Sequence, residues 1–343
     1  MLLHLNSAQS VPAVRERLTD LGLEHAVHAE SLTVEIRAED SIHSPGALRE
    51  SLKEFGAITA QKSRTPLLDS LGPDHEVLVQ SPSGPLRFRN FQPAIWIAGP
   101  CSLDEMNDVR ETARRVASLG VRVLRGGAVK PRTSPHEFQG VGRRGYRLLA
   151  EAAHEFGLAA ISEALSEDDV PEAVEFLDIV QIGARNMQNF ALLRKLGRAG
   201  KPVMLKRNAG ATLREWAAAA EYLLAEGNRS VILCERGVRG LERETRYTLD
   251  LAGAAFMQHR YGLPVVIDPS HATGTKQILD ACTAGAIAMG FAGVMLETHP
   301  RPVEARSDSL QALNADDFAA IAGRHLNPAG MRKHTPSPGL SIH

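Results

Sequence analysis

Three shortages narrow what this chain can be: cysteine, net charge and long apolar runs. The 343 residues hold three cysteines, an odd number at wide spacing that makes no disulfide framework, so we expect a reducing compartment and a cytoplasmic protein. The 39 Lys and Arg against 40 Asp and Glu leave a formal net charge of -1, so no global basic field favours nucleic acid and any anion binding must be local. No apolar run approaches the length of a membrane span, and the first residues lack the features of a signal peptide.

A glycine-rich dinucleotide turn is also missing, and this bears on the fold class. Between residues 94 and 326, apolar strand-like runs alternate with helical segments, which is the rhythm of an α/β (β/α)8 TIM barrel. An open doubly wound sheet is the alternative, but it usually has that glycine-rich turn after its first strand, where this chain reads GPCS at residues 99–102. The predicted strands are 95–98, 121–124, 158–161, 179–182, 203–205, 231–233, 265–267 and 293–296. The predicted helices are 109–119, 146–156, 168–176, 190–196, 213–224, 248–259 and 278–289.

Residues 1–62 predict a small separate domain. The pattern reads strand–helix–strand–strand–helix–strand, which suggests a ferredoxin-like α+β unit. It contains no obvious catalytic residues, so packing or oligomerisation is as good an interpretation as ligand sensing. The predicted strands are 2–5, 25–29, 32–36 and 57–60, and the predicted helices are 11–21 and 47–55.

Two further segments complete the domain organisation. Residues 63–93 predict a linker and then a β-hairpin, 76–79 with 86–88, around the turn cluster SPSG at residues 81–84. We expect this hairpin to act as a plug or lid at the closed end of the barrel. Residues 327–343 lack periodicity, and we expect a disordered tail.

The loop after the second predicted barrel strand carries a dense set of anion-binding groups. It reads KPRTSP at residues 130–135, so a lysine, an arginine and two hydroxyls lie within five positions. Lysine and arginine match phosphate, and the prolines reduce the ordering entropy lost on binding. A solvated basic turn is the plain alternative.

The residues at the strand ends favour the functional interpretation. Active sites of such barrels lie at the C-terminal ends of the strands, and here all eight ends are polar and most are charged. So many charges at one mouth would be costly without ligands. Acidic residues at these ends include Glu163, Glu235 and Asp268. Six cations predict binding of phosphates, or of a phosphate and a carboxylate: Arg125, Lys130, Arg132, Arg185, Lys206 and Arg236.

A second strand-end set predicts a metal site. Cys101, His271, Glu297 and Asp308 offer a thiolate, an imidazole and two carboxylates, which suit a borderline divalent metal such as Mn, Fe, Co or Zn. Each residue alone has a plainer explanation, such as a buried filler cysteine or a carboxylate that neutralises an arginine. Together, at the ends of the first, seventh and eighth strands, they favour metal. The other two cysteines, Cys234 and Cys282, we interpret as structural.

These residues resemble those of 3-deoxy-D-arabino-heptulosonate 7-phosphate (DAHP) synthases, most closely the short I-beta type with an N-terminal ferredoxin-like regulatory domain. The resemblance implies condensation of phosphoenolpyruvate with erythrose 4-phosphate, the first step of the shikimate pathway. It also implies a homotetramer and a tyrosine or phenylalanine effector at the N-terminal domain. The motifs that carry it are IAGPCS at 97–102, KPRTSP at 130–135 with FQG at 138–140, QIGARN at 181–186, DPSH at 268–271 and SD at 307–308.

The chemistry of this condensation suggests two proton roles: Lys130 is expected to donate to the developing alkoxide, and Glu163 or His271 to handle the water proton. The resemblance implies the roles of the other residues. Cys101, His271, Glu297 and Asp308 are the expected metal ligands. The expected phosphoenolpyruvate contacts are Arg125, Lys130, Ala184, Arg185, Lys206 and Arg236; those to erythrose 4-phosphate are Lys130, Pro131, Arg132, Thr133 and Ser134; and Glu235 and Asp268 complete the predicted substrate-binding set.

Departures from the family pattern are modest and touch no expected ligand. The segment after His271 begins with Ala272, where the family often has glycine, and Thr298 follows Glu297 in place of a β-branched aliphatic residue. The N-terminal unit matches the family only in its order of elements.

Three alternatives remain open at this point. A 3-deoxy-D-manno-octulosonate 8-phosphate synthase has a similar barrel, but such enzymes usually read KANRS or KANRT where this chain has KPRT, and they lack the N-terminal unit. A Schiff-base aldolase would need Lys206 as its nucleophile. A non-catalytic amino-acid sensor would have no need of the metal and phosphate residues.

Overall fold

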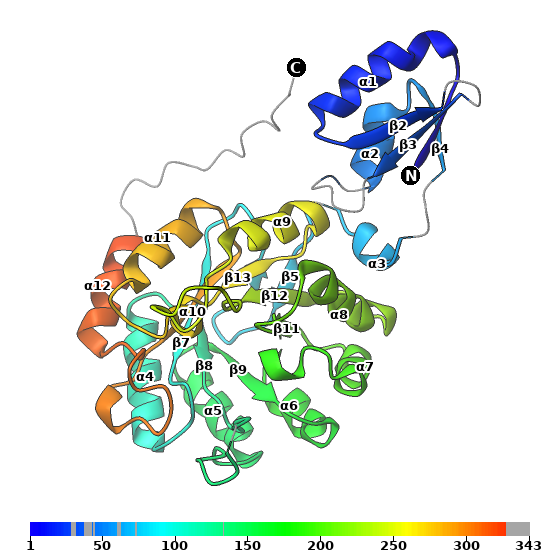
Figure 1. Cartoon of the computed structure of the whole chain (residues 1–343). Coiled ribbons are helices and arrows are strands. Elements are labelled where there is room, and N and C mark those ends of the chain that lie inside the picture. The colour runs from blue at the N-terminus through cyan, green and yellow to red at the C-terminus, as the bar shows by residue number, and fades with distance from the viewer. Residues whose placement is uncertain are drawn as a thin grey trace.

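Eight parallel strands close into a barrel in the computed structural model, which describes residues 1–28, 32–37, 43, 45–59, 63–72, 74–132 and 134–326 (Figure 1). The last strand pairs with the first, from Gly293 opposite Ile95 to Glu297 opposite Gly99, and this pairing closes the ring. The predicted (β/α)8 fold is therefore confirmed. The strands are β7 (Ile95–Gly99), β8 (Val123–Arg125), β9 (Ala159–Ala164), β10 (Ile179–Ile182), β11 (Val203–Lys206), β12 (Val231–Glu235), β13 (Val265–Ile267) and β14 (Gly293–Glu297).

Helices surround the barrel (Figure 1), and the predicted ranges agree with them to within a few residues. The sequence pattern missed α12, whose Phe318 packs edge-on against Trp96 with ring centroids 6.4 Å apart. It also missed the short α10, which begins because Pro269 occupies its first position and the Asp268 side chain accepts a hydrogen bond from the backbone N–H of His271. The helices are α4 (Met106–Ser118), α5 (Arg144–Glu155), α6 (Val170–Phe176), α7 (Phe190–Ala199), α8 (Leu213–Ala225), α9 (Leu251–Tyr261), α10 (Pro269–Thr273), α11 (Leu279–Ala288) and α12 (Ala315–His325).

A β-hairpin fills the end of the barrel opposite the strand C-termini. Its strands, β5 (Val77–Val79) and β6 (Leu86–Phe88), pair antiparallel and alternate buried with exposed residues. The buried ones form one apolar cluster with the residues that point into the barrel from the strands, such as Ile97 and Ile232. This is the position expected of a plug, so the opposite end is the one left for chemistry.

The N-terminal residues form a small unit with its own core, drawn apart from the barrel in Figure 1. Its four strands pair antiparallel in the order β2-β3-β1-β4, and the core joins the sheet to both helices, for example Leu3 and Val34 to Val14 and Leu48. The element order is the one that the sequence predicted. The elements are β1 (Leu2–Leu5), α1 (Val11–Asp20), β2 (Glu24–His28), β3 (Thr33–Arg37), α2 (Pro45–Leu52) and β4 (Gly56–Thr59). The predicted strand ends at 29 and 60, and the predicted tail 327–343, lie outside the described residues.

The predicted linker contains a short helix, α3 (Pro66–Asp69), that is tied to the barrel. The Glu221 carboxylate on α8 accepts hydrogen bonds from the backbone N–H groups of Leu67 and Leu68, at 2.8 and 2.9 Å. The Asp69 carboxylate lies 2.8 Å from the Arg260 guanidinium on α9, and both side chains are buried. The chain that leaves the N-terminal unit is therefore anchored before it enters the hairpin.

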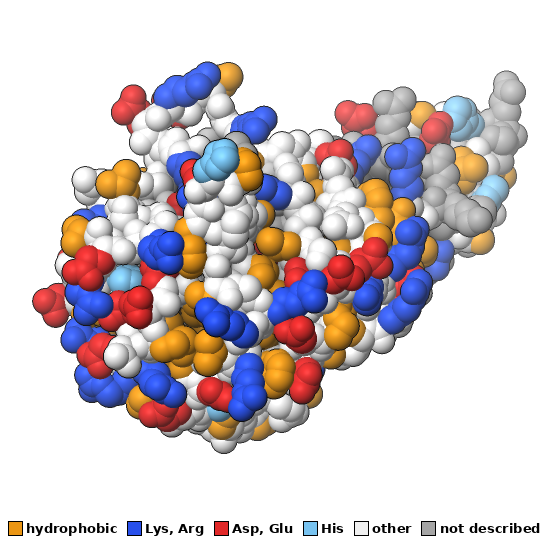
Figure 2. All heavy atoms as spheres, turned by 90° about the horizontal axis from the view of Figure 1, so that it is seen from below, with side chains coloured by type: hydrophobic (Ala, Val, Ile, Leu, Met, Phe, Trp, Pro, Cys, Tyr) orange, Lys and Arg blue, Asp and Glu red, His pale blue; other side chains and the backbone are white. Residues whose placement is uncertain are grey.

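The outer surface carries charges of both signs. On the face that Figure 2 shows, Lys and Arg side chains are interspersed with Asp and Glu, in keeping with the formal net charge of -1. Across the part of the chain that the structure describes, no helix combines the length and apolarity needed to span a membrane.

The packing of the hairpin predicts that substitution of Phe88 lowers the free energy of unfolding. This side chain is fully buried in the plug cluster, so Phe88→Ala removes a large apolar group and is expected to lower the free energy of unfolding by about 3–5 kcal/mol. Guanidinium unfolding followed by circular dichroism measures the change. Leu78→Ala, at an exposed position of the same hairpin, is the control and is expected to stay within about 0.5 kcal/mol. Equal effects of the two substitutions would mean that the hairpin is not part of the barrel core.

Candidate active site

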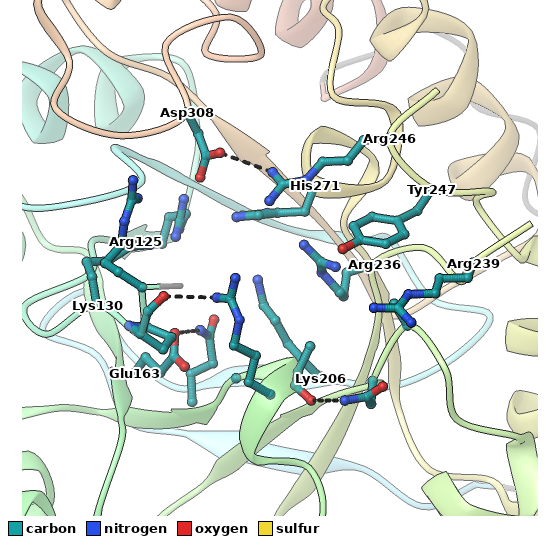
Figure 3. Close-up of a pocket in the computed structure, with 18 of the residues that line it drawn as sticks. Arg125, Lys130, Glu163, Lys206, Arg236, Arg239, Arg246, Tyr247, His271 and Asp308 are labelled. Carbon is teal, nitrogen blue, oxygen red and sulfur yellow. Dashed lines mark hydrogen bonds and ion pairs between the residues drawn. The ribbon is translucent and has the colours of Figure 1, made fainter. Parts of the chain in front are cut away.

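A cavity of about 500 Å³ opens at the C-terminal ends of the barrel strands. Its wall is mostly charged, and Figure 3 shows side chains from several strand ends pointing toward one another across it. Eleven residues predicted from the sequence line it: Arg125, Lys130, Pro131, Arg132, Glu163, Ala184, Arg185, Lys206, Arg236, His271 and Asp308. The predicted Thr133 lies outside the described residues. The other predicted residues, which do not line the cavity, are described below: Cys101, Ser134, Glu235, Asp268 and Glu297.

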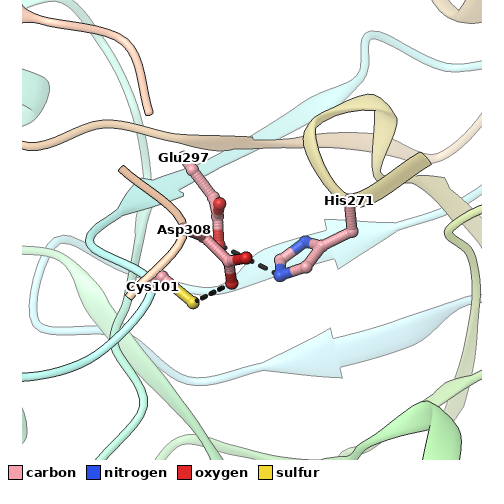
Figure 4. A group of neighbouring side chains, drawn as sticks. All are labelled: Cys101, His271, Glu297 and Asp308. Atoms are coloured by element: carbon pink, nitrogen blue, oxygen red, sulfur yellow. Dashed lines mark hydrogen bonds and ion pairs between the residues drawn. The ribbon is translucent and has the colours of Figure 1, made fainter. Parts of the chain in front are cut away.

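The four predicted metal ligands lie together (Figure 4). Cys101, His271, Glu297 and Asp308 each place one ligand atom so that all four atoms lie within 4.8 Å of one another. The Cys101 Sγ is 2.9 Å from Asp308 Oδ2, and His271 Nε2 is 3.0 Å from Glu297 Oε1. One sulfur, one nitrogen and two carboxylate oxygens fit a borderline divalent cation, so the donor set agrees with the predicted metal.

Close packing of the backbone helps to place Cys101 at this point. It follows β7, whose last residue Gly99 has a φ of +151°. A Cβ at Gly99 would lie 2.1 Å from the carbonyl oxygen of Arg125 on the neighbouring strand, so only glycine permits the two strand ends to approach. The Lys130 Nζ then lies 3.0 Å from Cys101 Sγ and 3.1 Å from the Cys101 carbonyl oxygen.

Two buried carboxylates hold His271 between them. Asp268 Oδ2 lies 2.7 Å from His271 Nδ1, while Glu297 lies at the opposite ring nitrogen. Burial lowers the pKa of His271, but the charges of Asp268 and Glu297 outweigh burial and raise the pKa to about 9. Burial raises the pKa of Asp268 and Glu297, but His271 and a neighbouring cation hold both pKa values well below the usual range.

The same carboxylates support two cations of the predicted phosphate-binding set. Lys206 Nζ donates to Asp268 Oδ2 at 2.7 Å, and Arg125 Nη1 donates to Glu297 Oε1 at 2.5 Å. Burial lowers the pKa of Arg125, yet the charges of Glu297, Cys101 and Asp268 together outweigh burial and raise the pKa, so the guanidinium stays charged inside the barrel. Burial likewise lowers the pKa of Lys130, and the charge of Cys101 leads the interactions that raise it overall.

Glu163 lines the cavity, and one of its carboxylate oxygens has no hydrogen-bond partner among the residues that the structure describes. Its Oε1 is buried and unpaired, while Oε2 accepts from Gln181 at 3.5 Å. Gly183 makes room for this side chain, because a Cβ there would lie 1.8 Å from Oε1. A buried oxygen without a partner is costly, so Glu163 is a candidate acceptor of a proton or a hydrogen bond.

Among the predicted substrate-binding residues that the structure describes, three do not line the cavity. Glu235 is fully buried, and its carboxylate accepts from Gly237 at 2.7 Å and pairs with Arg207 at 3.2 Å. Burial raises the pKa of Glu235. Asp268 is fully buried beneath Lys206. The Ser134 hydroxyl accepts a hydrogen bond from the backbone N–H of His136. Glu235 and Asp268 thus lie behind the cavity wall and support it, and their role in substrate binding stays a prediction.

Sequence reasoning missed the contribution of the segment between β12 and α9. Arg239, Arg246 and Tyr247 from this segment line the cavity, as do Gln181 and Asn208 elsewhere. The Tyr247 ring lies 4.9 Å from the Arg236 guanidinium. Burial raises the pKa of Tyr247, but the nearby guanidinium groups, Arg236 first, outweigh burial and lower the pKa. The signal was available, because residues 236–246 hold four arginines directly after the sixth strand.

Comparisons with known proteins agree with this geometry. Residues 90–325 match the family described as the DAHP synthetase I family. A phospho-2-dehydro-3-deoxyheptonate aldolase of Thermotoga maritima is 47% identical over 225 residues, which cover 66% of this chain and 67% of that one. A 2-dehydro-3-deoxyphosphooctonate aldolase of Variovorax paradoxus is 29% identical over 256 residues, which cover 67% of this chain and 88% of that one.

Solved structures give the same result. The crystal structure of the Thermotoga maritima phospho-2-dehydro-3-deoxyheptonate aldolase (DAHP synthase) has a TM-score of 0.71 at 35% identity and covers 94% of each chain. A truncated form of 3-deoxy-D-arabino-heptulosonate 7-phosphate synthase from the same organism has a TM-score of 0.69 at 38% identity, over 76% of this chain and 95% of that one. The fold and site thus define a metal-dependent class of barrel enzymes. Within this class, the chain belongs to the DAHP synthetase I family.

The cluster predicts that Cys101→Ala weakens metal binding. Removing the only sulfur donor of the four is expected to lower the affinity for Mn²⁺ by more than about 100-fold, since loss of even an indirect partner costs 10–100-fold. Titration of the protein with Mn²⁺, with free Mn²⁺ followed by electron paramagnetic resonance, measures this. Cys282→Ala, on α11 and outside the cluster, is the matched control and should bind as the wild type does. Unchanged binding by Cys101→Ala would remove the thiol from the site.

Proposed function

We propose that this cavity joins phosphoenolpyruvate to erythrose 4-phosphate and releases DAHP and inorganic phosphate, the first step of the shikimate pathway. The protein is thus a transferase, a 3-deoxy-7-phosphoheptulonate synthase. The observation that carries this function is the meeting, in one cavity, of a four-donor metal cluster with the cationic strand ends. Family membership supports it, and the higher identity to the heptulosonate enzyme (47% against 29%) favours it over the octulosonate reaction.

Two groups of cations can accommodate the two anionic substrates. We place phosphoenolpyruvate against the cations at the strand ends, which we call the floor of the cavity. Its carboxylate and phosphate need several fixed donors in a site that excludes water. Erythrose 4-phosphate is placed against the loop that follows β8, where Arg132 is half-buried and Pro131 lines the cavity. The first set is the buried Arg125, Lys130, Lys206 and Arg236, together with Ala184 and the exposed Arg185. The second set is Lys130, Pro131, Arg132, Thr133 and Ser134.

The four-donor cluster is the proposed metal site. Cys101, His271, Glu297 and Asp308 would hold a divalent cation, and among Mn, Fe, Co and Zn the donor set is compatible with each. When bound, such an ion supplies Lewis-acid polarisation of the sugar aldehyde.

The chain's own residues handle the charges and protons of the condensation. C3 of phosphoenolpyruvate attacks the aldehyde, C2 becomes cationic and takes up water, and phosphate leaves by C–O cleavage. Lys130, charged and next to Cys101, is placed to donate to the aldehyde oxygen as it becomes an alkoxide. Glu163, whose Oε1 has no hydrogen-bond partner among the described residues, is proposed to accept a proton from the water, with His271 as the alternative group.

The N-terminal unit is proposed to bind a regulatory tyrosine or phenylalanine, within a cytoplasmic homotetramer. Its separate core allows it to change position as a body, and it reaches the barrel through α3, whose two backbone N–H groups are fixed by Glu221. Through α3, which contacts α8 and α9, a change in the position of the N-terminal unit is proposed to be transmitted to the barrel.

A coupled assay tests the proposed reaction. The protein with Mn²⁺ is given phosphoenolpyruvate and either erythrose 4-phosphate or arabinose 5-phosphate, and phosphate release is followed before and after EDTA. We expect release with the four-carbon sugar alone and its loss with EDTA. Release with the five-carbon sugar would make the substrate assignment wrong, and no release with either sugar would favour a non-catalytic sensor.

The position of Glu137 predicts that its substitution changes the KM for the sugar phosphate alone. Its carboxylate lies 2.8 Å from the Arg132 guanidinium and lines the cavity, so an incoming phosphate must replace it. A half-exposed ion pair contributes about 0.2–1 kcal/mol, so Glu137→Gln is expected to lower KM for erythrose 4-phosphate by about 1.4- to fivefold, with KM for phosphoenolpyruvate unchanged. Glu151→Gln, which breaks a similar pair with Arg147 on α5, is the control. A raised KM would instead make Glu137 a support for Arg132.

A further inference from the structure

We propose that Arg246 is a positioning residue that holds three of the four residues of the metal cluster in place. This inference rests on the metal site of the proposed function. Arg246 belongs to the segment between β12 and α9, touches the cluster from outside, and lines the cavity (Figure 3).

In the first contact, the two carboxylate oxygens of Asp308 have different partners. Oδ2 lies 2.9 Å from Cys101 Sγ, inside the cluster, whereas Oδ1 accepts a hydrogen bond from Arg246 Nη1 at 3.0 Å. Asp308 has a φ of +51°, a left-handed conformation that a non-glycine residue adopts at some cost. The guanidinium therefore fixes the direction of a carboxylate whose backbone is strained, and leaves one oxygen for the cluster.

The second contact reaches Glu297 through an amide. Arg246 Nη1 donates to Gln311 Oε1 at 3.4 Å, and Gln311 Nε2 donates to Glu297 Oε2 at 2.5 Å. Because the arginine needs an acceptor and the carboxylate needs a donor, this pair of contacts sets the orientation of the Gln311 amide. Gln311 is buried, so its amide has few other partners and the chain of contacts is well defined.

The third contact reaches the helix that carries His271. The backbone N–H of Arg246 donates to the carbonyl of Thr273 at 3.0 Å, and that of Tyr247 donates to Ala272 at 2.7 Å. Gly274 allows this approach, because a Cβ there would lie 2.8 Å from the Cβ of Arg246. The segment is thus bonded to the residues that directly follow His271.

Two opposing effects of the guanidinium must be weighed. A positive charge near a cation repels it, but the Arg246 side chain is more than a third exposed and solvent screens that repulsion. The hydrogen bonds act directly on the ligands, and partners of this kind typically change metal affinity by 10–100-fold. Positioning is therefore expected to outweigh repulsion.

Titration with Mn²⁺ in the absence of substrates tests the proposal, with free Mn²⁺ followed by electron paramagnetic resonance. Arg246→Met is expected to weaken Mn²⁺ binding by about 10–100-fold. Arg246→Lys keeps the charge and one donor to Asp308 but loses the bridge to Gln311, so an intermediate affinity is expected. Arg243→Met removes an exposed charge from the same segment and is the matched control, expected to bind as the wild type does. Binding by Arg246→Met that equals or exceeds the wild type would overturn the proposal.

A double-mutant cycle and kinetics separate positioning from other roles. Gln311→Met shares one path with Arg246, so the double variant is expected to lose less affinity than the two single losses combined. At saturating Mn²⁺, Arg246→Met is expected to recover most of kcat with KM values unchanged. A raised KM with unchanged Mn²⁺ affinity would make Arg246 a substrate contact and overturn the proposal. If the wild type and Cys101→Ala bind Mn²⁺ equally, the metal site itself fails, which is a distinct result.

Discussion

Two carboxylates without exposed surface, Asp268 and Glu297, are the constraint on which the rest of the barrel mouth depends. Each stands at the end of a strand and compensates two groups that carry positive charge: Asp268 contacts Lys206 and His271, and Glu297 contacts Arg125 and His271. A cation buried without a partner is strongly destabilising, by about 3–5 kcal/mol when one member of such a pair is removed. The cavity can present fixed, charged donors to a phosphate only because these two carboxylates lie behind them.

This sharing links the proposed metal and phosphate sites. Glu297 Oε1 is within 3.0 Å of both Arg125 and His271, while Oε2 accepts a hydrogen bond from Gln311. One side chain therefore pairs with a cation of the floor, contacts a predicted metal ligand and is itself a predicted metal ligand. Groups joined in this way do not respond independently to substitution. A change at Glu297 or His271 therefore acts on substrate and metal together, and the contribution of either residue to one site cannot be measured by a single substitution.

The sequence predicted the strands well and the direction of some side chains poorly. All eight barrel strands were found because strands buried on both faces read as apolar runs, and 179–182 and 265–267 agree at both ends. Several others extend further, to Arg125, Lys206, Glu235 and Glu297, because the predicted runs stop at or just before the first charge while the strands continue into the mouth. Short α10 depends on a cap and α3 on anchoring contacts, which periodicity does not show.

The candidate site was predictable where one strand end carries one ligand, and less so where two charged residues are adjacent. Lys206 points into the cavity, whereas Arg207 turns outward, pairs with Glu235 and lies 5.7 Å from the Trp216 ring. Successive strand residues face opposite sides, so only the register within the closed barrel decides which of the two reaches the substrate. Arg246 was missed for a different reason: it lies in a connecting segment, far along the chain from every residue it contacts except Tyr247.

These differences divide the mouth into a floor, made of the buried charges at the strand ends, and a rim, made of Glu137, Arg132 and Arg246 on the connecting segments. The floor is rigid where its charges are paired, because Arg125 and Lys206 cannot move without leaving a buried carboxylate uncompensated. The rim pairs are partly exposed, so they exchange partners at little cost in free energy. Chemistry that needs fixed charge is therefore expected on the floor, while selection of the sugar phosphate and adjustment of the metal ligands fall to the rim, where substitutions change affinity without loss of the fold.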